Sequence, residues 1–313
     1  MRVAVIDIGT NTTRLFVADL DGRHISAELT RISRVTRLGA GVDADAILSP
    51  AALAREFTVL DAYAGEIAEL AVDRTVAVMT SAVRDAANGP AFAAEVHARY
   101  GIDAQILTGE QEAALTYRGA TDTVAPDSGE RILVVDIGGG STELVLGHGR
   151  TAEFHVSAQA GVVRQADRHL HGAEATAAEL AALRADVAAT LAAGVPLSLR
   201  SGVQRTLAVA GTPTSLAAID LALDPYDPTR THGYRLSLER VQSLEARLLA
   251  LSADERRNLP GLHPDRAGVI VPGTAILLAV MDLFGLDAIE VSEHDILRGT
   301  ALWLSSGEPL VAR

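Results

Sequence analysis

The chain has 313 residues, 48% of them hydrophobic and 21% charged, which describes a globular protein long enough for about two domains. Its net charge of -13 at pH 7 excludes a surface that attracts nucleic acid or an anionic membrane. The sequence contains no lysine and no cysteine, which excludes a catalytic lysine, disulfides and thiolate chemistry. Any phosphate must therefore be held by arginines, backbone amides or a metal ion.

Two features of the hydropathy pattern bear on the cellular location of the protein. We expect no signal peptide, because residues 1–4 run directly into an apolar strand pattern. The longest apolar stretch, residues 267–281, is shorter than the roughly 20 residues of a membrane span, and it contains Pro272. These features predict a cytoplasmic protein with no membrane partner.

The first part of the chain alternates between strand and helix patterns. Strands are predicted at residues 3–7, 13–19, 25–35, 75–80 and 104–107, and helices at about 50–70 and 91–100. Thr108 and Gln111 have capping-box spacing and begin a helix that runs through residue 119. Glu110 and Glu112 lie two residues apart in its first turns, so at most one of them faces a common site.

The polar segment at residues 121–130 is the predicted junction between domains. Strands are expected at about 152–156, 207–210 and 288–291, with helices at 162–169 and 175–193, mainly helical sequence up to 285, and a last helix from 292 to about 304. We predict an N-terminal domain at 1–124, a C-terminal domain at 125–297, and a helix at about 298–313 that could pack back on the first domain. Glu293 and Asp295 read as first-turn acids of the last helix.

One pattern occurs twice, at residues 5–17 and 134–146. In each copy an apolar strand ends in a carboxylate, and a glycine turn with hydroxyl residues leads into a second strand, a composition that can hold a phosphate on backbone N–H groups. The aligned pairs are Asp7 with Asp136, Gly9 with Gly138, Thr12 with Ser141, Thr13 with Thr142, and Arg14 with Glu143. The repetition predicts two copies of one domain.

The structure that follows each turn separates this pattern from commoner ones. A Walker loop and a Rossmann fingerprint both lead into a helix, whereas a strand follows here. Two glycine hairpins in a sheet protein remain an alternative, but such hairpins need neither the aspartate nor the repeat. A third turn with glycine and hydroxyl residues, 211–215, does precede a helix, whose N-terminus also favours an anion.

Together with the third turn at 210–215, the two copies resemble the actin/Hsp70/sugar-kinase superfamily. The segments 80–86 and 109–113 narrow this resemblance further. Within the superfamily, the chain is similar to the short, two-domain form of the exopolyphosphatase/guanosine pentaphosphatase (Ppx/GppA) family. The resemblance implies an α/β fold of two ribonuclease-H-like (actin-like ATPase) domains with an interdomain cleft. One departure is Ala210, where many superfamily members have the first of two glycines.

The resemblance also implies a role for each matching residue. Glu112 would activate the attacking water, and Asp136 and Glu143 would form the metal and water site, with Asp7 as the matching carboxylate of the first domain. The implied phosphate-binding residues are Thr10, Asn11, Arg14, Arg84, Gly138, Gly139, Gly140 and Ser141. The implied cofactor is Mg²⁺ or Mn²⁺. Assembly as a homodimer is left open.

The predicted activity is metal-dependent hydrolysis of terminal phosphate from inorganic polyphosphate. Alternatives are a guanosine pentaphosphate 5′-phosphohydrolase, a sugar or acid kinase, and a non-catalytic nucleotide-binding scaffold. Polyphosphate is favoured over a nucleotide because no aromatic residue stands directly beside the glycines of these turns. The arginines near the predicted cleft suit a long anion instead: Arg14, Arg84, Arg164 and Arg168.

Overall fold

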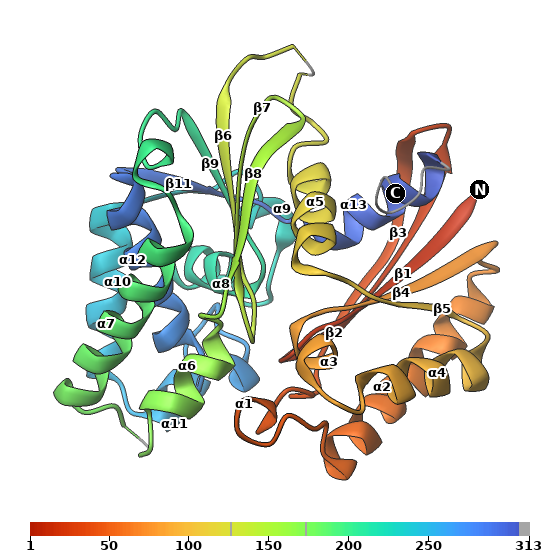
Figure 1. Cartoon of the computed structure of the whole chain (residues 1–313), viewed down its shortest axis with the longest axis horizontal. Coiled ribbons are helices and arrows are strands. Elements are labelled where there is room, and N and C mark those ends of the chain that lie inside the picture. Colours follow the sequence, from red (N-terminus) through yellow and green to blue (C-terminus); the bar gives the residue numbers. More distant parts are fainter. Residues whose placement is uncertain (126, 173, 307–313) are drawn as a thin grey trace. The chain divides into compact units, whose positions relative to one another are not determined.

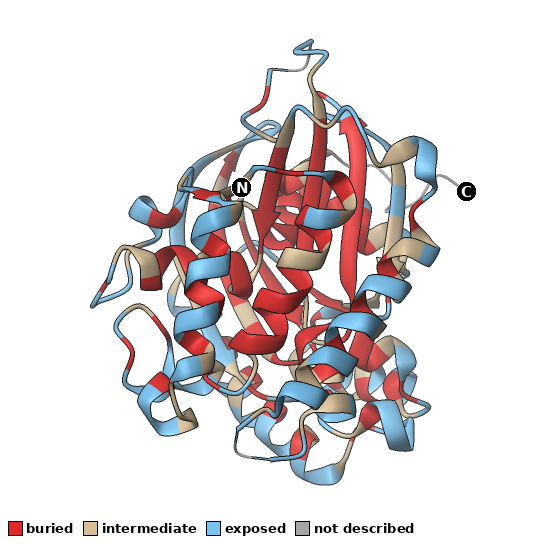
Figure 2. Ribbon diagram, turned by 90° about the vertical axis from the view of Figure 1, so that its left-hand side faces the viewer, coloured by how far each residue is buried: buried red, intermediate tan, exposed pale blue. Residues whose placement is uncertain are grey.

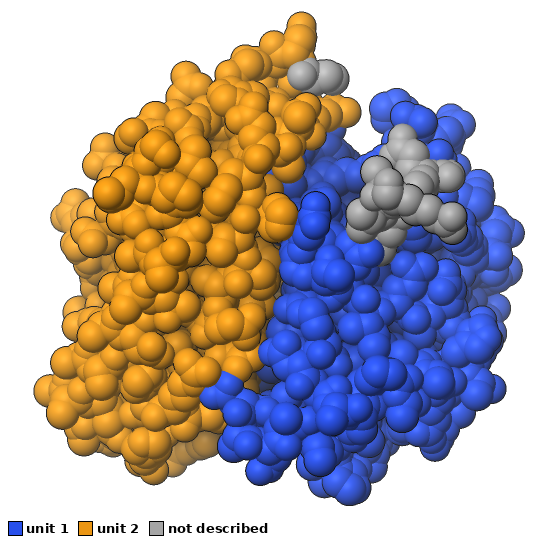
Figure 3. All heavy atoms as spheres, in the orientation of Figure 1, with its two compact units in different colours: residues 1–122, 294–313 blue, residues 123–293 orange. Residues whose placement is uncertain are grey.

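The computed structural model describes residues 1–125, 127–172 and 174–306. They group into two compact units, Met1–Asp122 with His294–Arg313, and Thr123–Glu293, which Figure 3 colours separately. Both units combine a sheet with helices, so the predicted α/β class is confirmed. Residues 307–313 of the predicted terminal helix lie outside the described residues. The division into independently folding domains, with its predicted bounds, stays a prediction.

Unit 1 contains a sheet with the strand order β3-β2-β1-β4-β5 (Figure 1). The first three strands form an antiparallel meander, and β4 and β5 continue it in parallel with β1. The strands are β1 (Arg2–Ile8), β2 (Thr12–Asp21), β3 (His24–Val35), β4 (Arg74–Met79) and β5 (Asp103–Ile106). The helices are α1 (Val42–Asp45), α2 (Pro50–Glu69), α3 (Ser81–Asp85), α4 (Gly89–Tyr100), α5 (Gly109–Ala120) and α13 (Ile296–Ser306).

Helices cover both faces of this sheet, and the pleat of β1 assigns each side chain to one of them. Ala4, Ile6 and Ile8 belong to the core formed with α2 and α4. Val3 and Val5 alternate with them and belong to the core formed with α5 and α13. Burial on both faces explains why β1 reads as a continuous apolar run. The same alternation directs Asp7 to the face covered by α5 and α13.

Unit 2 contains a sheet with the strand order β10-β11-β9-β6-β7-β8. The strands are β6 (Arg131–Ile137), β7 (Thr142–His148), β8 (Thr151–Ala158), β9 (Arg205–Val209), β10 (Arg235–Ser237) and β11 (Ala288–Val291). The helices are α6 (Val162–His169), α7 (Ala177–Gly194), α8 (Gly211–Asp220), α9 (Pro228–Thr231), α10 (Leu238–Ala250), α11 (Ala253–Arg257) and α12 (Ile270–Phe284), with 3₁₀ turns at Leu197–Leu199 and Pro264–Arg266.

The core of unit 2 lies between its sheet and a layer of helices. Leu133, Val135 and Ile137 of β6 pack in one cluster with apolar residues of α6, α7, α10 and α12. Figure 2 shows the strands as a largely buried layer behind helices whose outer faces are exposed. Asp136 lies between Val135 and Ile137 in sequence, so its side chain points to the opposite face of the sheet.

The two sheets repeat one topology, as the duplicated pattern predicts. The order β3-β2-β1-β4-β5 of unit 1 corresponds to β8-β7-β6-β9-β11 of unit 2, with an antiparallel meander followed by parallel strands in both. The extra edge strand β10 falls in sequence predicted to be mainly helical. It covers Arg235–Ser237 and is too short to display a period of two.

The last helix corrects one prediction. It begins at Ile296, and Ser292 to Asp295 precede it in non-helical conformation. Glu293 and Asp295 are therefore not first-turn acids. The Asp295 carboxylate instead accepts the N–H of Leu297 at 3.0 Å, as a capping side chain does.

Candidate functional site

The first copy of the repeated pattern joins β1 to β2 and contains an ion pair. Asp7 and Arg14 lie opposite each other in the antiparallel register, so their side chains share one face. Arg14 donates from Nε and Nη2 to Asp7 Oδ2, at 2.9 and 2.6 Å. Burial raises the pKa of Asp7, and Arg14 opposes this effect. A neighbouring cation favours the ionised form of such a buried carboxylate.

The turn between these strands is held by its neighbours in unit 1. Gly9 N–H donates to Thr12 O at 3.1 Å and closes the turn. Thr10 Oγ1 lies 2.8 Å from Ser81 Oγ at the start of α3. The Asn11 carbonyl accepts the N–H groups of residues 36 and 37 at 3.1 and 3.0 Å. These hydrogen bonds fix the positions of Thr10 and Asn11 and keep the turn compact.

Glu112 lies near the start of α5 and is held there by Arg84 of α3. Arg84 Nη1 donates to Glu112 Oε2 at 2.8 Å and to Leu107 O at 3.0 Å. The capping box of Thr108 and Gln111 is present and orients this helix start. Glu112 is buried whereas Glu110 is exposed, which agrees with the expectation that only one of them faces inward. A short path therefore joins the first turn to Glu112, through Ser81 and Arg84 of the same helix α3.

The second copy joins β6 to β7 and has the same turn. Gly138 N–H donates to Ser141 O at 3.0 Å, as Gly9 does in the first copy. The carbonyls of Gly138 and Gly139 accept N–H groups from the first turn of α6, at 2.9 and 2.8 Å. Arg164 Nε donates to the carbonyl of Gly140 at 2.7 Å. Because the carbonyls of the turn are bonded to α6, the N–H groups of Gly139 to Ser141 are the ones suited to an anion.

Two carboxylates, rather than an ion pair, occupy the strand ends of the second copy. Asp136 and Glu143 lie opposite each other in register and therefore share one face of the sheet. Both are buried, at 7% and 1% exposed. Glu143 Oε1 accepts the hydroxyls of Ser141 and Ser157 at 2.6 and 2.7 Å. Like charges in this arrangement repel, so a cation would stabilise the pair.

The third turn, between β9 and α8, carries an arginine against its backbone. Ala210 has φ of 69°, a conformation that favours glycine and rarely suits a residue with a Cβ. A Cβ added at Gly211 would lie 1.5 Å from Arg266 Nη1, so the guanidinium packs directly against the backbone of the turn. The N-terminus of α8 thus has a basic side chain beside it. This arrangement adds positive charge to a helix end that already favours anions.

Comparison with known proteins shows which family the chain belongs to. The model of the Ppx/GppA phosphatase family matches residues 16–301. The chain belongs to the Ppx/GppA phosphatase family. Exopolyphosphatase 2 of Mycobacterium tuberculosis is 37% identical to this Ppx/GppA protein over 319 aligned positions, which cover 97% of the chain and 98% of that relative.

Two further comparisons agree with the family. The Aquifex aeolicus member of the Ppx/GppA protein family has a crystal structure that matches with a TM-score of 0.80 at 28% identity, covering 99% of both chains. The Guanosine-5′-triphosphate,3′-diphosphate pyrophosphatase of Vibrio atlanticus is 30% identical over 95% of the chain, which spans 58% of that relative. The predicted family and its actin-like fold are therefore confirmed.

The carboxylates of this Ppx/GppA protein fit the divalent metal that the family implies. Mg²⁺ is usually bound through one or two carboxylates, with water and phosphate oxygens completing its shell. In unit 2, Asp136 and Glu143 supply two facing carboxylates. In unit 1, Asp7 Oδ1 is buried and has no hydrogen-bond partner among the described residues. Among residues 1–125, 127–172 and 174–306, no group of three or more histidine, aspartate and glutamate side chains could hold a metal ion.

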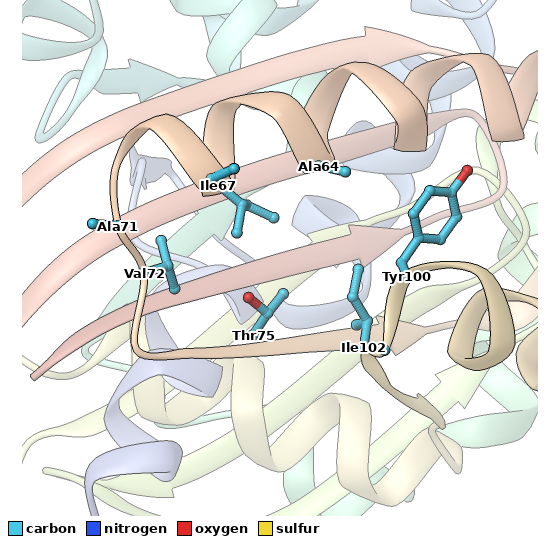
Figure 4. A pocket seen from close by; sticks show the side chains of 9 residues that line it. Ala64, Ile67, Ala71, Val72, Thr75, Tyr100 and Ile102 are labelled. Atoms are coloured by element: carbon cyan, nitrogen blue, oxygen red, sulfur yellow. The ribbon is translucent and has the colours of Figure 1, made fainter.

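A separate pocket of about 350 Å³ in unit 1 has a different chemistry (Figure 4). It lies between the C-terminal half of α2 and the segments that lead into β4 and β5, and residues such as Ile67, Val72 and Ile102 line it. No charged side chain lines the pocket, which therefore does not suit phosphate. The pocket therefore lies near the N-terminal ends of β4 and β5. The first turn and Arg84 instead follow the C-terminal ends of β1 and β4.

The structure places the predicted site residues in two sets within separate units, and their roles stay predictions. Unit 1 brings together Asp7 with Arg14, and Arg84 with Glu112. Unit 2 brings together the glycine turn, Asp136 and Glu143. Arg168, a candidate for substrate contact, lies 3.7 Å from Asp186 in an ion pair.

Sequence interpretation missed several polar partners of these residues. Ser157 and Asp295 have no local signal, because their partners Glu143 and Arg14 lie 14 and 281 residues away. Asp295 is almost fully buried and accepts a hydrogen bond from Arg14. Although burial acts to raise it, the pKa of Asp295 is held below its ordinary value by Arg14 and Arg31. Ser81 lies inside the 80–86 segment and was open to detection from its position before Arg84.

In the part of the chain that the structure describes, no helix is both long enough and apolar enough to cross a membrane.

Proposed function

We propose that this Ppx/GppA protein is an exopolyphosphatase, which hydrolyses the terminal phosphate of inorganic polyphosphate in a metal-dependent reaction. One observation carries the proposal beyond family membership. A buried glutamate, Glu112, is held by Arg84, whose helix also bonds to the phosphate turn through Ser81 and Thr10. That combination supplies a base, a cation and hydroxyl donors in one structural unit, as phosphoanhydride hydrolysis requires.

Glu112 acts as the general base. Its carboxylate accepts a proton from the attacking water while the new P–O bond forms and the anhydride P–O bond breaks. The products are orthophosphate and a chain shorter by one phosphate. Arg84 fixes the position of Glu112 Oε2 through the 2.8 Å hydrogen bond. It also places positive charge close to the phosphoryl oxygens, where negative charge accumulates during the reaction.

The turns bind phosphate oxygens of the substrate. In unit 2, the N–H groups of Gly139 to Ser141 would hold them, because the turn carbonyls already bond to α6. In unit 1, Thr10 and Asn11 would add side-chain donors. Arg14 is engaged by Asp7 and Asp295. Its contribution to phosphate binding is therefore smaller than that of Arg84.

Asp136 and Glu143 in unit 2, and Asp7 in unit 1, would each offer a carboxylate to a divalent cation, Mg²⁺ or Mn²⁺. When bound, such an ion supplies charge that neutralises the phosphoryl oxygens and polarises them toward attack. Ser141 and Ser157 keep the Glu143 carboxylate in one orientation. The local fold thus prepares the carboxylates before substrate arrives.

Hydrolysis of guanosine pentaphosphate is the second candidate, favoured by the name of the Vibrio atlanticus relative. A guanine base needs an apolar or stacking wall, and no aromatic residue adjoins the glycines of the three turns. Tyr226 is 46% exposed, but its hydroxyl donates to Glu293. We therefore rank polyphosphate first. A cytoplasmic location and assembly as a homodimer belong to the same proposal.

The test is competition between substrates. With the same Mg²⁺ concentration, phosphate release is followed from long polyphosphate and from guanosine pentaphosphate present together, and separately from ATP. We expect kcat/KM to be highest for polyphosphate, with the advantage falling as salt screens the arginines. A higher kcat/KM for the guanosine nucleotide would make the second candidate correct. Absence of phosphate release from all three would refute hydrolysis itself.

A further inference from the structure

Asp295 has no part in the reaction as described so far, yet it lies in the charged cluster of unit 1. Its side chain is only 4% exposed. Oδ2 accepts a hydrogen bond from Arg14 Nη1, and Oδ1 lies 3.8 Å from Arg31 Nη1. A carboxylate removed from water to this extent is costly unless it is paired. Arg14 therefore stabilises the position of the Asp295 carboxylate, and Asp295 in turn stabilises the position of Arg14.

Arg14 is held by carboxylates on two sides. Nε and Nη2 donate to Asp7 Oδ2, and Nη1 donates to Asp295. A guanidinium is a rigid planar fork, so three charge-assisted hydrogen bonds to two partners allow it one orientation. Arg14 cannot turn without breaking bonds to both carboxylates at once. The orientation of Asp7 follows from that of Arg14.

This arrangement distinguishes the two oxygens of Asp7. Oδ2 takes both hydrogen bonds from Arg14, whereas Oδ1 is buried and has no hydrogen-bond partner among the described residues. An Arg14 without Asp295 could rotate and cover both oxygens. Asp295 therefore keeps Oδ1 available for a hard cation or for water bound to it.

The backbone around Asp295 is fixed just as firmly. A Cβ added at Gly119 of α5 would lie 1.9 Å from Asp295 O, and one added at Gly299 of α13 would lie 1.8 Å from Leu115 O. The two helices can approach this closely only because both positions lack a side chain. Figure 1 shows α5 and α13 side by side. Since α5 also carries Glu112, one helix contact fixes both the base and the charged cluster.

We propose that Asp295 is a positioning residue for metal binding: it holds Arg14 so that Arg14 orients Asp7 with Oδ1 not hydrogen-bonded and directed to the divalent cation. The proposal deepens the function proposed above and rests on Asp7 as a metal ligand there. Asp295 acts through Arg14 and Asp7. Partners that orient a ligand in this way are typically worth about 10- to 100-fold in metal affinity or activity.

The first test removes the charge of Asp295 and keeps the shape of its side chain. Asp295→Asn should weaken Mn²⁺ binding to the substrate-free protein by about 10- to 100-fold, measured by electron paramagnetic resonance, and should raise the Mg²⁺ needed for half activity by a similar factor. The matched control is Asp122→Asn. Asp122 pairs with Arg298 of the same helix α13 at 2.5 Å, with both side chains 14% exposed, so the control removes a comparable ion pair outside the cluster.

We expect Asp122→Asn to bind Mn²⁺ like the wild type. Equal losses in the two variants would mean that both merely loosen α13, and this result would overturn the proposal. Unchanged Mn²⁺ binding in Asp295→Asn would also overturn it, as would a wild type that binds no Mn²⁺. If Asp295→Asn does not fold, Asp295→Glu takes its place, because it keeps the charge and displaces the carboxylate; the same loss is expected.

A second test asks whether Asp295 acts through Arg14. In an Arg14→Gln background, Asp295→Asn should change Mn²⁺ affinity little, because the link to Asp7 is already broken. A full additional loss would show that Asp295 acts by another route and would overturn the proposal. These measurements need no polyphosphate. A wild type that binds Mn²⁺ normally but does not hydrolyse polyphosphate would refute the proposed function alone.

Discussion

The two copies of the strand-turn-strand pattern share a backbone and differ in charge. In both, a glycine N–H closes the turn, from Gly9 to Thr12 O at 3.1 Å and from Gly138 to Ser141 O at 3.0 Å. The residues opposite each other at the strand ends are Asp7 and Arg14 in unit 1, but two acids, Asp136 and Glu143, in unit 2. In unit 1 the carboxylate at the strand end therefore faces an arginine, whereas in unit 2 the facing residues are both acids, whose mutual repulsion a cation would reduce.

A second difference lies beneath the turns. Thr13 Oγ1 donates to the buried carboxyl of Glu56, with both oxygens at 2.8 Å. The equivalent residue in unit 2, Thr142, donates instead to the carbonyl of Ala160 at 2.6 Å. Unit 1 thus contains an additional buried titratable group that unit 2 lacks at this position. The comparison teaches that a duplicated backbone can be specialised by single side chains at equivalent positions.

The largest expected effect tests whether unit 1 supplies the base. Glu112→Gln should lower kcat by about 10²- to 10⁴-fold, because an amide cannot accept the proton from water. The variant should still fold and bind substrate, since glutamine keeps the shape that Arg84 contacts. Steady-state phosphate release and circular dichroism measure the two sides of this prediction.

The control for that variant is Glu110→Gln, two residues earlier on the same helix. Glu110 is exposed, so we expect activity close to that of the wild type. Near-normal turnover in Glu112→Gln would remove the base from unit 1 altogether.

The next prediction compares the strand-end acids directly. In EDTA, Asp7→Asn should lower the free energy of unfolding by about 3 kcal/mol, because it breaks the buried ion pair between Asp7 and Arg14. Asp136→Asn removes one of two facing acids and should change it by less than about 1 kcal/mol. Asp136→Asn should nevertheless raise the Mg²⁺ concentration needed for half activity. Urea unfolding and Mg²⁺ titration measure these effects.

Two results would contradict this contrast. Equal destabilisation by Asp7→Asn and Asp136→Asn in EDTA would show that charge balance is not what separates the copies. Superimposed Mg²⁺ titrations of wild type and Asp136→Asn would place the metal on other residues.

The last prediction concerns Glu56 and pH. Burial raises the pKa of Glu56 to about 7, from an ordinary value of 4.5. Between these values the folded protein keeps a proton that the unfolded chain releases, so stability falls as pH rises through this window and is fully present only below it. The total loss is about 3 kcal/mol at most. Glu56→Gln cannot ionise, so its stability relative to wild type should increase from pH 4.5 to pH 8.

Urea unfolding at both pH values measures this difference. Glu66→Gln, which removes an exposed carboxylate from the same helix α2, is the control and should stay within about 0.5 kcal/mol of wild type at both. A difference between Glu56→Gln and wild type that does not change with pH would mean that Glu56 is not protonated in the folded protein.

How far sequence interpretation reached can be judged from particular residues. The alignment of Arg14 with Glu143 predicted that the two copies differ in charge at this position, and the strand register places these residues opposite Asp7 and Asp136. Helical spacing separated Glu112 from Glu110. The start of the last helix was wrong by four residues, because Ser292 and two nearby acids match a capping pattern that the chain does not use.

The sequence by itself determined the strand-turn-strand units, their duplication and the family, because those signals are written in neighbouring residues and repeat at a fixed spacing. Only the tertiary structure decided that Arg14 is shared between Asp7 and Asp295, and that Glu56 lies beneath Thr13. Asp295 is 281 residues from Arg14, and Glu56 is 43 residues from Thr13. Such pairs form when the chain returns to one sheet through packed helices, and nothing in the local sequence around either partner specifies the other.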